Sequence, residues 1–110
     1  MDKKDLRLKD MAKMVDDYIG QFEEGYFSPL ALLASLSEEV GELAKEVNHY
    51  YGEKPKRKDE EKNTVDMELS DCLFIILCFA NALDIDLEEA FLKMMDKFNE
   101  RDHDRWTRKE

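Results

Sequence analysis

The sequence predicts an all-α protein, a single domain arranged like a four-helix bundle. Apolar residues recur at intervals of three and four along most of the chain, as they do on helices with one buried face. Helix-breaking residues are few, with four glycines and two prolines among 110 residues, and 40% of the residues are charged. A chain of this length forms one domain, residues 1–110, with a small core, so partner subunits are expected.

The first two predicted helices are separated by a short turn. An amphipathic helix is expected over roughly residues 5–24, and the periodic pattern stops at Gly25. Ser28 suits the N-cap of the second helix and Pro29 its first position, and this helix should extend to about Tyr51. Its narrow apolar stripe consists of Leu33, Leu36, Val40, Leu43 and Val47.

A charged segment at residues 52–63 follows the second helix. It contains one glycine, one proline, nine charged residues and no large apolar residue, so it offers nothing to bury. We interpret it as a mobile, solvated loop, with closure of its lysines over a bound triphosphate as the alternative.

The third predicted helix begins near Thr64 and is apolar around its whole circumference from Val65 to Phe79. Such a helix must be surrounded by other elements. Two of the three neighbouring helices have only narrow apolar stripes. A homodimer or a higher homo-oligomer is therefore expected, with the second and third helices contributing to the shared core.

The fourth helix is expected after a tight turn at residues 84–86. Asp86 and Glu89 have the spacing of a capping box, which marks a helix start. The helix carries Leu87 and Phe98 on its inner face and runs into a polar tail from about residue 102.

The charge of the chain limits its partners. A net charge of −10 argues against long nucleic acid, which needs clustered lysines and arginines, but divalent cations would let an acidic protein bind a polyphosphate. No apolar stretch suits a signal peptide, and the run at 73–83 is too short to cross a bilayer, so a cytoplasmic protein without a membrane partner is expected. Cys72 and Cys78 are interpreted as buried, reduced thiols.

Six carboxylates on two of the predicted helices carry the functional prediction. They are Glu38, Glu39, Glu42 and Glu46 on the second helix and Glu68 and Asp71 on the third. At roughly 100° per residue, Glu39, Glu42 and Glu46 fall in one sector beside the apolar stripe. Glu68 and Asp71 project from the same side of the most apolar helix, so both are expected to be at least partly buried.

A divalent cation is the partner that these carboxylates predict. Burying ionised carboxylates without partners is costly, and neither helix offers a lysine or arginine at matching spacing to Glu39, Glu68 or Asp71. Antiparallel helices that each give an acidic pair supply the oxygen ligands that Mg²⁺ prefers, so Glu39 and Glu42 should face Glu68 and Asp71. A solvated acidic face is the alternative for Glu42 or Glu46 taken alone.

The string Glu38-Glu39-Val40-Gly41-Glu42, followed after the charged loop by Glu68-Leu69-Ser70-Asp71, resembles the EExxE…ExxD signature of the MazG-like, all-alpha NTP pyrophosphatases. The resemblance extends from the second to the fourth predicted helix. It implies assembly as a homodimer or homotetramer, and Mg²⁺ as cofactor with Mn²⁺ as a substitute. The implied metal ligands are Glu39, Glu42, Glu68 and Asp71. The fourth helix should contact the phosphates, and Lys97, Asn99 and Arg101 are the candidates there.

The implied reaction is Mg²⁺-dependent hydrolysis of nucleoside or deoxynucleoside triphosphates to the monophosphate and pyrophosphate. Removal of non-canonical nucleotides is a role that this activity suggests. A magnesium-bound water is expected to attack the α-phosphorus. Glu38, next to the ligands, is the candidate to orient or deprotonate that water.

Two other classes compete with this reading. Glu46-x-x-His49 and Glu100-x-x-His103 match an element of di-iron carboxylate bundles, but Glu100 and His103 fall opposite the apolar face of the fourth helix. The second class is a non-catalytic helical adaptor, whose apolar third helix binds a partner while the acidic residues maintain solubility.

Overall fold

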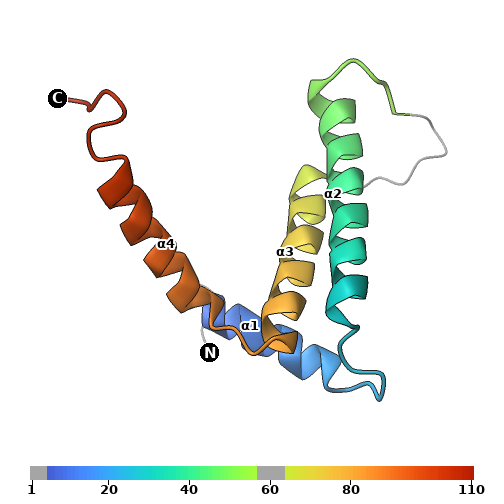
Figure 1. Ribbon diagram of the computed structural model, residues 1–110. Helices are drawn as coiled ribbons and strands as arrows, with labels where there is room; N and C mark the ends of the chain where they lie inside the picture. Colours follow the sequence, from blue (N-terminus) through green and yellow to red (C-terminus); the bar gives the residue numbers. More distant parts are fainter. Residues whose placement is uncertain (1–4, 57–63) are drawn as a thin grey trace.

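Four helices confirm the predicted all-α class. The computed structural model of the chain describes residues 5–56 and 64–110. The helices are α1 (Leu8–Ile19), α2 (Pro29–Tyr51), α3 (Val65–Ala82) and α4 (Leu87–Arg101), and the described residues contain no strand. Helices α2 and α3 lie side by side and antiparallel, and α1 crosses near the end where α3 finishes (Figure 1). Among these residues, no helix is both long and apolar enough to cross a membrane.

The helix starts follow the predicted caps. Ser28 accepts a hydrogen bond from the Ala31 amide (3.3 Å) directly before Pro29, and Asp86 accepts one from the Glu89 amide (3.0 Å). The first helix, however, ends at Ile19 and not near residue 24 as predicted. Gly20, a poor helix former, occupies its C-cap, and a series of turns follows.

The core forms where α1 crosses the α2–α3 pair. Val15, Leu32, Leu77 and Cys78 are buried together at this crossing. Cys72 and Cys78 are free thiols within α3, and burial raises the pKa of both. Both cysteines are therefore buried and reduced, as predicted.

A polar network ties α1 to the end of α3. The Asn81 amide nitrogen donates to the Ala12 carbonyl (2.8 Å) and to the Tyr26 hydroxyl (3.0 Å). The Tyr26 hydroxyl in turn donates to Asp16 (2.7 Å). Burial, with the bond to Asp16, raises the pKa of Tyr26 to about 12, so the phenol stays neutral and keeps donating.

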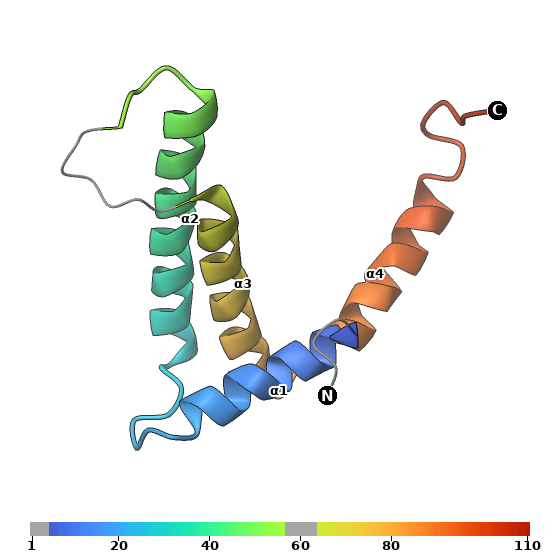
Figure 2. The same ribbon diagram turned by 180° about the vertical axis from the view of Figure 1, so that it is seen from behind.

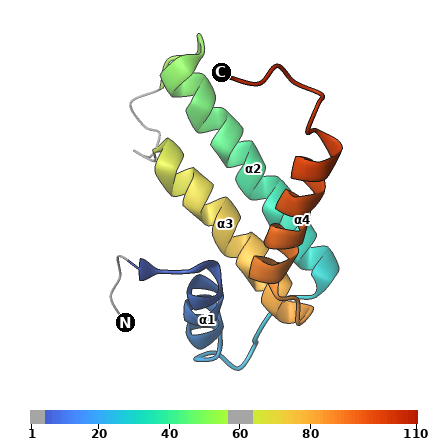
Figure 3. The same ribbon diagram turned by 90° about the vertical axis from the view of Figure 1, so that its left-hand side faces the viewer.

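Helix α4 leaves the other helices instead of packing along them. It diverges from the α2–α3 pair and meets the rest of the chain at its own first turns, near α1 (Figures 1 and 2). There Leu87 packs on the core, and Arg7 forms a two-bond ion pair with Glu88 (3.1 and 2.7 Å). In the side view, α1 lies beside the end of α3 and at an angle to the long α2–α3 pair (Figure 3). The apolar residues left exposed on α4 are Phe91, Leu92, Met94, Met95 and Phe98.

Helix α3 is covered on only part of its circumference. The expectation that it would be surrounded is not met within one chain, because α4 does not reach it. Its exposed apolar residues include Leu69, Leu73 and Ile76, and α2 exposes Leu33, Val40 and Val47. The radius of gyration is 17.6 Å, against about 13 Å for a compact domain of this length.

Replacing Asn81 with alanine should lower the free energy of unfolding by about 1–3 kcal/mol, because two hydrogen bonds are lost and a partly buried carbonyl loses its donor. Urea denaturation followed by circular dichroism measures this. Ser70→Ala, which removes an exposed hydroxyl, is the control and should stay within about 0.5 kcal/mol of the wild type. Equal effects of the two substitutions would contradict the role given to Asn81.

Candidate metal centre

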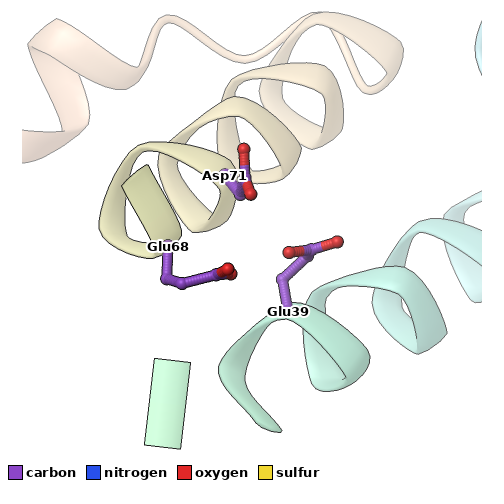
Figure 4. Close-up of side chains that lie close together, drawn as sticks. All are labelled: Glu39, Glu68 and Asp71. Carbon is purple, nitrogen blue, oxygen red and sulfur yellow. The ribbon is translucent and has the colours of Figure 1, made fainter. Parts of the chain in front are cut away.

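Three of the four predicted metal ligands converge between α2 and α3. One carboxylate oxygen from each of Glu39, Glu68 and Asp71 lies within 4.8 Å of the other two. Glu39 projects from α2 toward Glu68 on α3, and Asp71 lies beside them one turn further along α3 (Figure 4). This convergence arises from the antiparallel packing of α2 on α3.

The three carboxylates differ in exposure. Glu68 is only 3% exposed, and its Oε2 atom has no hydrogen-bond partner within the described part of the chain. Glu39 is partly buried, whereas Asp71, which was predicted to be at least partly buried, is exposed. Three residues rotate a helix by roughly 300°, which is about 60° short of a full turn, so Asp71 lies at the edge of the α2–α3 contact and still reaches Glu39 and Glu68.

The carboxyl groups of Glu39 and Glu68 both have a raised pKa. Burial raises the pKa of Glu68, and the neighbouring charges of Asp71 and Glu39 raise it further. Burial also raises the pKa of Glu39, with added repulsion from Asp71 and Glu42. A cation between α2 and α3 would oppose both shifts, because an opposite charge nearby favours the ionised carboxylates.

The other predicted acidic residues lie around this cluster. Glu42 is exposed and does not belong to the close group of three, although its charge raises the pKa of both Glu39 and Glu68. Glu38 is exposed, and its charge also raises the pKa of Glu39. Glu42 as a ligand and Glu38 as a base therefore stay predictions.

Glu46 is buried to the same degree as Glu68, which the sequence pattern did not predict. It is 3% exposed and pairs with Lys56, with 3.0 Å between Oε2 and Nζ. Lys56 belongs to the segment that was expected to be a solvated loop, yet only 21% of its side chain is exposed. The rest of that predicted mobile loop, residues 57–63, lies outside the described residues.

The predicted phosphate-binding residues lie apart from the acidic cluster. Lys97, Asn99 and Arg101 are on α4, which diverges from α2 and α3 within one chain (Figure 1). Arg101 instead pairs with Asp102 and lies over the ring of Phe98, 4.8 Å from its centroid. Within one chain these three residues therefore lie away from the acidic cluster, and their contact with the phosphates stays a prediction.

The di-iron alternative also fails on geometry. Glu46 pairs with Lys56, and His49 Nδ1 donates to the Lys54 carbonyl (3.0 Å). Glu100 and His103 lie at the far end of the diverging α4 segment. The two Glu-x-x-His elements therefore do not face one another across a common centre.

The donor set of the cluster fits a hard divalent cation. All three groups offer carboxylate oxygens, and no donor within residues 5–56 and 64–110 bonds to the buried Oε2 atom of Glu68. Mg²⁺ binds to few carboxylates and takes its remaining ligands from water and phosphates. The exposed side at Asp71 leaves room for such ligands. A carboxylate cluster able to hold a metal therefore lies between two helices of an all-α domain.

Comparison with known proteins identifies the class. Residues 27–106 match the MazG nucleotide pyrophosphohydrolase domain. The chain therefore belongs to the MazG nucleotide pyrophosphohydrolase family, a class of hydrolases that act on nucleotides. It is 60% identical to the protein YpjD of Bacillus subtilis (strain 168) over 106 residues, 96% of each protein. This assignment disfavours the adaptor reading.

Two crystal structures share this fold. That of YPJD from Bacillus subtilis is 58% identical, with a TM-score of 0.78 over 86% of this chain and 97% of the other. That of a Bacillus-conserved MazG protein, a nucleotide pyrophosphohydrolase, is 55% identical, with a TM-score of 0.75 over 90% and 94% of the two chains.

Glu68→Gln should stabilise the metal-free protein at pH 7 by about 1–2 kcal/mol, because it removes a buried negative charge that lies close to the carboxylates of Glu39 and Asp71. Since the pKa of Glu68 is raised in the folded state, the wild type regains stability as the pH falls toward that value. The difference between variant and wild type should therefore shrink at lower pH. Chemical denaturation in EDTA at several pH values measures it, and a variant less stable than the wild type at pH 7 would contradict the assignment.

Proposed function

We propose that this protein hydrolyses nucleoside or deoxynucleoside triphosphates to the monophosphate and pyrophosphate with Mg²⁺, which Mn²⁺ can replace. The observation that carries the proposal is the convergence of Glu39, Glu68 and Asp71, with one buried oxygen of Glu68 that receives no hydrogen bond from the part of the chain that the structure describes. Membership of the MazG nucleotide pyrophosphohydrolase family supports the same chemistry. Removal of non-canonical nucleotides is the biological role that we propose for it.

The acidic side chains on α2 and α3 bind the cation in this proposal. Glu39, Glu68 and Asp71 hold the cation, and Glu42, one turn from Glu39, completes the set when a ligand is bound. When bound, the cation neutralises phosphate charge and lowers the pKa of a coordinated water. Burial of Glu68 by the α2–α3 contact fixes one ligand before the substrate arrives.

Glu38 is our candidate for the general base. It is exposed beside Glu39, where it can accept a proton from the attacking water without being a ligand itself. The water oxygen bonds to the α-phosphorus, the bond from that phosphorus to the bridging oxygen breaks, and pyrophosphate leaves with the electron pair.

We further propose that the protein acts as a homodimer or homotetramer. Its accessible surface of 9282 Å² exceeds the roughly 6,300 Å² expected for a compact chain of 13.0 kDa. The excess is larger than the roughly 800 Å² that one partner buries in a standard interface, and exposed apolar side chains lie along α2, α3 and α4. In such an assembly, α4 of one subunit can bring Lys97, Asn99 and Arg101 to the acidic cluster of another.

Glu39→Gln and Asp71→Asn should each lower kcat/KM for pyrophosphate release by about 100-fold or more while leaving helicity intact, because each removes a charged ligand. The assay uses a panel of canonical and modified ribo- and deoxyribonucleoside triphosphates with Mg²⁺. Glu23→Gln changes an exposed glutamate on the α1–α2 turn and is the matched control. Release of pyrophosphate from no triphosphate of the panel by the wild type would refute the proposed activity.

Sedimentation at micromolar concentration should show a dimer or tetramer for the wild type. Leu73→Asp on α3 and Phe98→Asp on α4 each place a charge on an exposed apolar face and should shift the protein toward monomer. Asp17→Lys, on an exposed position of α1, is the control. A wild type that sediments as a stable monomer would contradict the assembly.

A further inference from the structure

A buried ion pair lies at one end of the acidic cluster. Glu46 follows Glu39 by seven residues, two turns along the same face of α2, and lies in the α2–α3 contact. Its Oε2 atom is 3.0 Å from Lys56 Nζ, and the two side chains are 4% and 21% exposed. The acidic region thus contains a lysine ammonium from outside both helices.

The chain after α2 holds this ammonium in place. The Gly52 amide donates to the Asn48 carbonyl (3.0 Å), which closes the helix. His49 Nδ1 then donates to the Lys54 carbonyl (3.0 Å), so residues 52–56 fold back along the last turns of α2. Lys56 Nζ also lies 5.6 Å from the centroid of the Tyr50 ring, within range of a cation–π contact.

The position of this ion pair links it to the metal ligands. Glu46 lies two helical turns from Glu39, and both Glu46 and Glu68 are 3% exposed, so the ion pair and the metal ligands share the buried side of α2 and α3. No other cation of the described residues forms an ion pair with Glu46, so without Lys56 it would be a second buried carboxylate beside Glu68 that lacks a cationic partner among them. It would then be available to a divalent cation, as Glu68 is.

We propose that Lys56 is a positioning residue of the metal centre, which keeps Glu46 out of the metal ligand set and weakens the binding of free divalent cations by its fixed positive charge. The proposal rests on the proposed function. A site with fewer available carboxylates holds Mg²⁺ loosely by itself and binds it mainly together with the substrate phosphates. Lys56 would thereby favour the metal–nucleotide complex over the metal alone.

Charge-changing variants at this pair test the role. Binding of Mn²⁺ and of Mg²⁺ without nucleotide is measured by calorimetry on the full chain. Lys56→Met should bind the metal about tenfold more tightly and Glu46→Gln about tenfold more weakly, since they change the local charge by one unit in opposite directions. The double variant should return close to the wild type, and Lys56→Arg should retain wild-type affinity. Lys13→Met removes an exposed cation on α1 and is the control.

The directions in which Lys56→Met and Glu46→Gln change the metal affinity distinguish this role from a purely structural one. If the ion pair only stabilises the fold, both single variants will weaken metal binding, and that result would overturn the proposal. If Lys56→Met does not fold, Glu46→Gln can be compared with the double variant. Both have a neutral side chain at position 46, so they differ only in the charge at position 56. Equal metal affinities of these two variants would reject the role. A wild type that binds neither metal would refute the proposed function itself, whereas metal binding without the opposite shifts refutes only the role of Lys56.

Discussion

The packing of α2 against α3 buries the carboxylate of Glu68, and no hydrogen-bond donor from the described residues reaches its Oε2 atom. The same packing brings Glu39 and Asp71 to within 4.8 Å, so that three acidic groups share one space. An isolated protein could relieve this repulsion by taking up protons, and the raised pKa of Glu68 and of Glu39 has that direction. A divalent cation would relieve the repulsion without protonation, because its charge offsets those of the three carboxylates.

The other parts of the fold support the packing of α2 against α3. Helix α1 crosses the lower end of the α2–α3 pair, where Val15, Leu32 and Leu77 form the core, and Asn81 fixes the crossing. At the other end, the Lys56–Glu46 pair compensates the second buried carboxylate. Helix α4 contributes little to this body and leaves its apolar face uncovered, so the element expected to contact phosphate is also the element that most needs a partner.

Local patterns in the sequence predicted the parts that depend on a single helix. The caps at Ser28 and Asp86 and the inward-facing Glu39 and Glu68 follow from helical periodicity, because neighbours along one helix determine them. The place of α4 could not be predicted, since an amphipathic stripe does not specify which surface covers it. The contact between Lys56 and Glu46 was not predicted, because it joins residues ten apart through a turn, and helical spacing indicates only contacts within one helix.

Locating the metal itself tests the central claim most directly. Crystals soaked in Mn²⁺ and measured at a wavelength where manganese scatters anomalously should show a peak between α2 and α3, within bonding distance of oxygens from Glu39, Glu68 and Asp71. Anomalous density only at other surface carboxylates, with these three side chains turned apart, would contradict a metal-dependent site between the two helices.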